Sequence, residues 1–257
     1  MYKLKLRSQQ LGRDERDFQI WKVEEKIEEI SPSNTAFIIC DVWDKHRCYS
    51  ANVRSEKIIP RIAKTVEVAR QRGTLIFHCP SLVIGYYKNF EAFKRMENEL
   101  VNYKRKAFVA KTKKSPPDCP LEVGRESCET SGSKSKSVTE EKLTWRRQHP
   151  DIRIDNKKDV ISIDGSLISH YLDYRNIQYV FIAGFHLNVC LLMQQFGIKS
   201  MVNLGKSMLL LRDLTDSFYN PKHAPYVSHE EGTQIAIGYV EKFWCPSLLS
   251  KDIIEDY

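Results

Sequence analysis

The sequence has no apolar run long enough to cross a membrane, which argues against membrane-spanning helices. Its amino terminus also lacks the apolar stretch of a secretory signal. The seven cysteines include no CxxC pair, so the sequence indicates neither a structural zinc site nor a disulfide framework. An odd set of free thiols suits a reducing compartment. We therefore expect a cytoplasmic protein with no membrane partner.

Basic residues are concentrated in one segment of an otherwise ordinary composition. Hydrophobic residues are 42% of the 257 residues and charged residues 28%, as is usual for a globular protein with one core. Residues 104–147 hold 12 Lys and Arg against 6 Asp and Glu, which accounts for most of the net charge of +7. The segment lacks the aromatic interleaving of a single-strand binder. We predict a mobile basic insertion at 104–143 and do not expect nucleic acid as a partner.

Apolar strands alternate with helical patterns along the rest of the chain, which indicates a parallel sheet with helices on both faces. Residues 1–33 are polar, and we interpret them as an amino-terminal extension of a domain at 34–250. The predicted strands are 35–42, 74–78, 159–163, 179–184 and 207–212, with a sixth, edge strand near Cys245. The predicted helices are 57–72, 89–103, 166–176 and 229–243.

Two strands end on residues that can carry chemistry. The strand at 179–184 ends at Gly184, and Asn188 is a good N-cap for a helix that holds Cys190 in its first turn. A helix N-terminus favours a thiolate, although a buried core cysteine is the alternative. The strand at 35–42 ends on Asp41, at the sheet edge where catalytic groups of open α/β folds gather.

These two segments resemble the isochorismatase-like cysteine hydrolases, a superfamily that includes nicotinamidases and N-carbamoyl amidohydrolases. The family has an Asp after its first strand and a G-x-x-T-[DN]-x-C turn after its fourth, matched here by Asp41 and Gly184–Cys190. The stretches 41–46, 145–150 and 212–221 look like those of a bacterial subgroup. The resemblance implies a three-layer α/β/α sandwich with a mainly parallel six-stranded sheet in the order 3-2-1-4-5-6, which places Asp41 beside Cys190.

The resemblance also implies roles for the residues of the site. Cys190 would be the nucleophile and Asp41 the proton carrier, which requires a pKa raised by burial. Backbone N–H groups of His186 and Cys190 would bind the oxyanion, at a turn that the family shapes with a cis peptide bond, here Phe185–His186. The substrate-binding residues would be Asp44, His46, His186 and Asn188.

Two family residues are missing. Leu187 stands where the family has its Thr, and the segment Ile163-Asp164-Gly165 has no lysine where the catalytic Lys follows the third strand. Lys157 and Lys158 precede that strand, at its other end. Arg147 and His149 are candidate substitutes.

Three functions therefore stay open. The first is a cysteine hydrolase that cleaves the C–N bond of a small amide without a cofactor. The second is a catalytically silent scaffold that binds a small ligand or a partner, and the third is a binding protein for nucleic acid or an acidic partner through the basic loop. No standard metal signature is present, although Asp44, His46, Cys48 and His78 raise the question of a divalent ion. The partners expected are a small-molecule substrate and a second copy of the chain.

Overall fold

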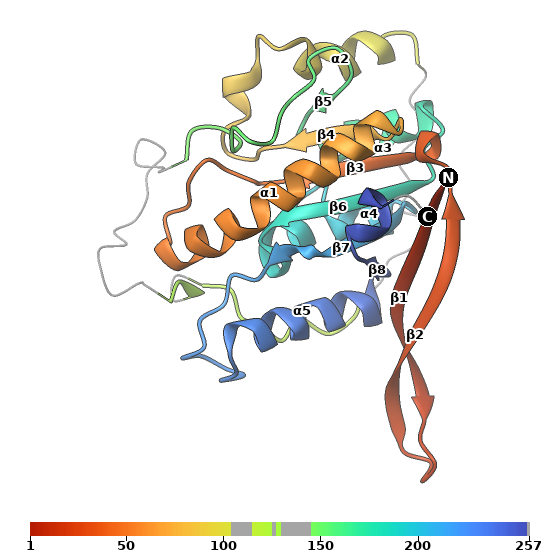
Figure 1. The fold of residues 1–257 in the computed structure, drawn as a ribbon, viewed down its shortest axis with the longest axis vertical. Helices are drawn as coiled ribbons and strands as arrows, with labels where there is room; N and C mark the ends of the chain where they lie inside the picture. The colour runs from red at the N-terminus through yellow and green to blue at the C-terminus, as the bar shows by residue number, and fades with distance from the viewer. Residues whose placement is uncertain (104–114, 125–126, 130–144, 256–257) are drawn as a thin grey trace.

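The computed structural model describes residues 1–103, 115–124, 127–129 and 145–255 (Figure 1). Within these residues the strands form one sheet of eight, in the order β2-β1-β8-β7-β6-β3-β4-β5. The helices cover both faces, as predicted for a three-layer sandwich (Figure 1). None of the described helices is long and apolar enough to cross a membrane.

Six strands run parallel in the predicted order. These are β5 (Val160–Ile161), β4 (Leu75–Cys79), β3 (Thr35–Cys40), β6 (Tyr179–Phe185), β7 (Ser207–Asp216) and β8 (Ser247–Leu248). Every residue of β3 is buried, because helices pack on both faces of the central strands. A strand covered on both sides needs a continuous apolar run, which is the pattern that predicted β3 and β6.

The prediction of six strands is wrong at one end of the sheet. Residues of the amino-terminal extension form a long antiparallel hairpin of β1 (Tyr2–Arg13) and β2 (Gln19–Ile30). β1 also pairs with β8 through Arg7 and Ser247, so β8 is an interior strand and not the edge. The sequence did not predict the hairpin because most of its residues are polar. Only three apolar residues of β1, Tyr2, Leu4 and Leu6, are buried, and β2 is mostly exposed.

The helices divide between the two faces of the sheet. α1 (Tyr49–Gln71) and α6 (Lys251–Ile254) pack on one face. α2 (Glu91–Leu100), α3 (Gly165–Tyr174), α4 (Ile198–Asn203) and α5 (His229–Phe243) pack on the other. α5 begins at a capping box in which Ser228 and Glu231 bond each other's backbone N–H groups, which accounts for a start that agrees with the sequence.

Candidate active site

The carboxyl ends of β3 and β6 meet at the centre of the sheet. Cys40 of β3 lies opposite Gly184 of β6, so Asp41 and the Gly184–Cys190 turn leave the sheet side by side. Gly184 has φ of 122°, and a Cβ there would collide with the carbonyl oxygen of Cys40. Only glycine permits this close approach of the two strands. The peptide bond Phe185–His186 is cis, as the resemblance implied.

Asp41 is buried and hydrogen-bonded on both of its carboxylate oxygens. The residue is 1% exposed, and its backbone φ is 49°. The backbone N–H of Ser81 donates to Oδ1 at 2.6 Å, and the Ser81 hydroxyl donates to Oδ2 at 2.8 Å. Burial raises the pKa of Asp41 to about 6, although hydrogen bonds from Cys190 and Ser81 oppose the shift. The carboxyl group therefore changes protonation near neutral pH, as a general base requires.

Cys190 is hydrogen-bonded to Asp41, so the structure brings the two residues together. The predicted long helix after Asn188 is wrong, because Cys190 lies in a short π-helical turn, Leu187–Leu191. The surroundings also favour the thiol over the thiolate in the resting protein. Burial, followed by the charge of Asp41, raises the pKa of the Cys190 thiol well above its ordinary value. Gln194 and the backbone of His186 act in the opposite direction by hydrogen-bonding the sulfur.

Ser81 and Gln194 were not expected at the site. Nε2 of Gln194 lies 3.4 Å from Oγ of Ser81, so the two side chains connect the carboxylate to the thiol from one side. Neither residue belongs to a recognisable motif. Ser81 follows Cys79-Pro80 at the end of β4, and its place after a central strand was the only signal in the sequence.

No cation replaces the family lysine among the described residues. None of the groups that shift the pKa of Asp41 or Cys190 is a lysine or an arginine. Arg147 is exposed, and His149 lies 3.7 Å from Glu56. Lys157 and Lys158 are exposed at the amino end of β5. Asp164 is instead the N-cap of α3.

An aromatic pocket opens beside the Cys190 sulfur. Its volume is about 520 Å³. Its wall contains two parallel indole rings, Trp43 and Trp145, whose centroids are 4.5 Å apart. His46 lies parallel to both rings and edge-on to His186. The pocket is lined by Trp43, His46, Arg47, Leu82, Val123, Gly124, Trp145, His186, Val189, Cys190 and Phe218.

Both histidines of the pocket are neutral at physiological pH. Burial and the charge of Arg47 lower the pKa of His46 to about 4. Its Nδ1 accepts the backbone N–H of Cys48 at 3.1 Å, so the ring proton is on Nε2. Burial and the neighbouring His46 lower the pKa of His186 to about 3. In the described part of the chain, no hydrogen-bond partner reaches Nε2 of His186 or Nε1 of Trp145.

Two predicted substrate-binding residues have other partners. The side-chain oxygen of Asn188 accepts the backbone N–H of Phe218 at 2.8 Å, and its amide donates to the Phe218 carbonyl. Asp44 accepts the backbone N–H of Arg146 and does not line the pocket. Asn188 therefore positions the Phe218 ring, and Asp44 positions the segment that carries Trp145. His46 and His186 do line the pocket, as predicted.

The described residues contain no cluster of His, Cys, Asp and Glu arranged to hold a metal ion. His78 is buried between Gln148 and Asp159, both 3.0 Å from its ring nitrogens. Cys48 forms a disulfide with Cys128, which contradicts the expectation that the cysteines are free. No spacing rule indicated this pair, because the two residues are 80 positions apart.

An ionic cluster centres on the buried Asp216, two residues before Phe218 of the pocket wall. Oδ2 of Asp216 accepts from Arg54 at 2.8 Å, and Oδ1 lies 2.8 Å from Nε2 of His229. Glu129, next to the disulfide, bonds Arg54 at 2.7 Å. Despite its burial, hydrogen bonding to His229 and the charges of His229 and Arg54 lower the pKa of Asp216 to about 2. The predicted mobile insertion at 104–143 falls largely outside the described residues.

Solved structures are similar to this chain in fold. No family model matches the sequence, and no curated protein matches it either. A cysteine hydrolase from Pseudomonas syringae pv. phaseolicola 1448A is 16% identical, with a TM-score of 0.50, over 88% of this chain and 92% of that one. An isochorismatase from Pseudomonas putida KT2440 is 8% identical, with a TM-score of 0.47, over 87% and 91%. An isochorismatase family protein from Burkholderia thailandensis is 11% identical, with a TM-score of 0.45, over 87% and 97%. The chain has the isochorismatase-like fold.

Proposed function

We propose that the protein is a cysteine-dependent hydrolase that cleaves the C–N bond of a small, planar amide. One observation carries the proposal. A thiol and a carboxyl group whose pKa is about 6 are hydrogen-bonded to each other beside an aromatic pocket. Burying a carboxylate is costly, and groups with shifted pKa values concentrate at functional sites.

The proposed reaction uses the pair in two steps. Asp41 takes the proton of the Cys190 thiol while the sulfur attacks the carbonyl carbon of the amide. Backbone N–H groups of His186 and Cys190 stabilise the oxyanion. Asp41 then gives its proton to the leaving nitrogen, and an amine and a thioester result. Water, deprotonated by Asp41, hydrolyses the thioester, which releases the acid and restores the thiol.

Neutral hydrogen-bond donors would supply part of the stabilisation of negative charge that a lysine at the site would give. The Ser81 hydroxyl and backbone N–H stabilise the ionised form of Asp41, and Gln194 stabilises the thiolate as it forms. These donors carry no positive charge, so they stabilise the two anions less than an ammonium group would. We therefore propose a slower enzyme whose activity depends on Ser81.

The pocket wall favours a flat substrate without a charge. Trp43, Trp145 and Phe218 present aromatic surface, and both histidines are neutral, so the only charge in the lining of this pocket is that of the exposed Arg47. An aromatic or heteroaromatic carboxamide is flat and meets this requirement.

The second candidate is a catalytically silent scaffold that binds such a molecule without cleaving it. The observation that favours it is that no described lysine or arginine shifts the pKa of Asp41 or Cys190, together with a thiol pKa raised well above its ordinary value. Both candidates predict ligand binding. They differ in whether a covalent intermediate forms.

A panel of small aromatic carboxamides tests the two candidates. Ammonia release reports turnover, and mass spectrometry of the denatured protein reports an acyl group on Cys190. We expect Cys190→Ala to abolish both signals. Cys119→Ala is the matched control, because Cys119 is the other free cysteine that is only partly buried. Saturable binding by wild-type protein without ammonia or acylation would support the silent scaffold instead.

A further inference from the structure

The amino-terminal hairpin leaves one edge of the sheet open. β2 is the last strand of the sheet, and nothing in the described part of the chain pairs with its outer edge. Figure 1 shows the hairpin extending beyond the layered body of the molecule. A 12-residue edge presents a row of backbone N–H and C=O groups to which another strand can add.

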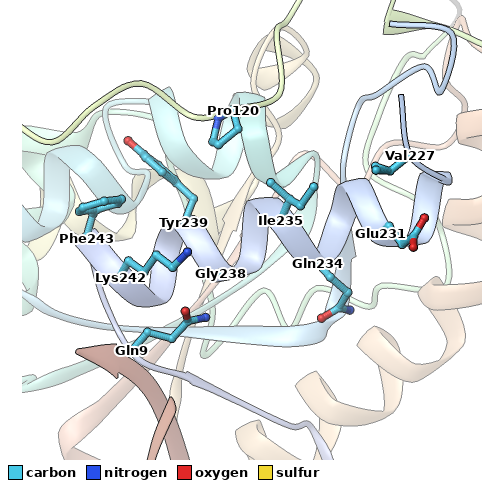
Figure 2. A pocket seen from close by; sticks show the side chains of 10 residues that line it. All are labelled: Gln9, Pro120, Val227, Glu231, Gln234, Ile235, Gly238, Tyr239, Lys242 and Phe243. Atoms are coloured by element: carbon cyan, nitrogen blue, oxygen red, sulfur yellow. The ribbon is translucent and has the colours of Figure 1, made fainter. Parts of the chain in front are cut away.

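Only part of this hairpin is supported by its own chain. On one face, the Trp21 ring packs edge-to-face on Phe243 of α5 at 5.3 Å, and Gln9 donates to Glu241 at 3.0 Å. Figure 2 shows Gln9 beside α5, close to Lys242. Val23 and Ile27 follow Trp21 on the same face of β2, and they are 59% and 65% exposed. Large apolar side chains thus lie on the open edge strand.

We propose that β2 pairs with β2 of a second copy, antiparallel and about a two-fold axis at Glu25, so that one sheet runs through both subunits. Directly opposed residues of antiparallel strands point to the same face of the sheet. With a two-fold axis normal to the sheet, one residue of β2 must therefore lie opposite its own copy at the axis. Near the middle of β2 this residue is Glu24, Glu25 or Lys26.

The axis at Glu25 matches every charge next to it with an opposite one. Lys22 then lies opposite Glu28 of the partner subunit, and Glu24 lies opposite the partner's Lys26. Val23 lies opposite Ile27 of the partner subunit, so the exposed apolar side chains cover each other. Symmetry repeats each of these pairs.

Glu25 itself meets the partner's Glu25 on the axis. Its charge is already compensated, because Nζ of Lys5 lies 2.6 Å from its carboxylate and Arg7 is its cross-strand neighbour. Lys5 and Arg7 also hold its pKa below the ordinary value, so it stays ionised beside them. The repulsion on the axis is therefore weakened within each subunit.

Neighbouring registers bring like charges together. An axis at Glu24 sets Lys22 against the partner's Lys26, and an axis at Lys26 sets Glu24 against the partner's Glu28. Charges on an edge strand commonly prevent pairing with other chains. Here the same charges permit one self-complementary register and oppose the adjacent ones.

A single cysteine tests the register. Opposed Cβ atoms in an antiparallel pair are about 4.5–5.5 Å apart, close to what a disulfide requires. Under mild oxidation we expect Glu25→Cys to form a covalent dimer, whereas Glu24→Cys, which lies opposite the partner's Lys26, does not exceed the wild type. Equal cross-linking by the two variants, or none by Glu25→Cys, would overturn the proposal.

A charge exchange tests the pairing itself. We expect the wild type to sediment at twice the 30.0 kDa mass of one chain. Lys22→Glu and Glu28→Lys should each weaken the dimer on the order of tenfold, because each turns two attractive pairs into repulsive ones. Mixing the two variants should restore assembly, since both 22–28 pairs of the mixed dimer are then of opposite charge.

The restored mixture separates a lost interface from misfolding. Glu28 also accepts a hydrogen bond from the Tyr179 hydroxyl at 2.8 Å, so Glu28→Lys alone could weaken the fold. A misfolded variant would not recover on mixing. A monomeric wild type, or a mixture no more associated than its components, contradicts the proposal.

Discussion

The two ends of the sheet differ in how their strands are stabilised. β3 and β6 are buried on both faces, and helices on each side exclude water from them. β1 and β2 are stabilised by pairing with each other, and most β2 side chains are exposed. The central strands can therefore hold a buried carboxylate in a fixed position. The hairpin instead exposes charged side chains and the backbone groups of β2 at the edge of the sheet.

The comparison predicts that changes at the centre affect turnover, whereas changes in the hairpin affect assembly. The largest effect is expected for Asp41→Asn. If Asp41 is the proton carrier, turnover falls by roughly two to four orders of magnitude. The wild-type rate should rise with pH through about 6, as Asp41 loses its proton, and then level off. Lys22→Glu in the hairpin should leave turnover unchanged. An equal loss of turnover in Asp41→Asn and Lys22→Glu would contradict this separation of the two ends of the sheet.

The next largest effect is expected on stability, from Asp216→Asn. The change removes one of the two carboxylates that pair with Arg54 and His229, Glu129 being the other, and should cost about 1–3 kcal/mol in urea unfolding. Because the folded pKa of Asp216 is about 2, its contribution is present above pH 4 and is lost as the pH falls towards 2. Asp173→Asn is the control: Asp173 pairs with Lys206 but is 56% exposed, so its loss should cost less than about 1 kcal/mol.

Asp41→Asn should also change stability, in the opposite direction. The folded pKa of Asp41 is raised to about 6, so the folded state binds this proton more tightly than the unfolded state does. Wild-type stability therefore falls as the pH rises from about 4 to 6, and the variant has no such loss. We expect the variant to be more stable by about 1–3 kcal/mol at pH 7 and equally stable near pH 4. If the two proteins were equally stable at both pH values, folding would not raise the pKa of Asp41.

The smallest effect is expected in the hairpin, from Trp21→Ala. Its ring packs on Phe243 and lies 5.5 Å from the Lys242 ammonium, contacts worth about 1 kcal/mol together. Thermal unfolding should register the loss, with turnover intact. Phe18→Ala is the control, because Phe18 is an aromatic residue at the tip of the hairpin, outside β2, and is 64% exposed. A fall in turnover with Trp21→Ala would show that the hairpin influences the central strands.

The sequence alone predicted the parts of the molecule that depend on neighbouring residues. Continuous apolar runs identified β3, β6 and β7, and the helical pattern of residues 229–243 identified α5. The order of the six parallel strands, and the meeting of Asp41 with Cys190, came from the resemblance of two short motifs. Such runs can be recognised in the sequence because a strand buried on both faces consists almost entirely of apolar residues.

Only the tertiary structure decided what surrounds the Asp41–Cys190 pair. Ser81 and Gln194 reach it from β4 and from beyond the π-helical turn, and the disulfide joins Cys48 to a residue 80 positions away. Nothing in the spacing of these residues indicates their contact. The raised pKa of the Cys190 thiol also required the structure, because the depth of burial and the distance to Asp41 set it, and not the helix start that the sequence suggested. Local patterns determine which segments become strands and helices, but burial and charge at a site arise from contacts between segments that are distant in the sequence.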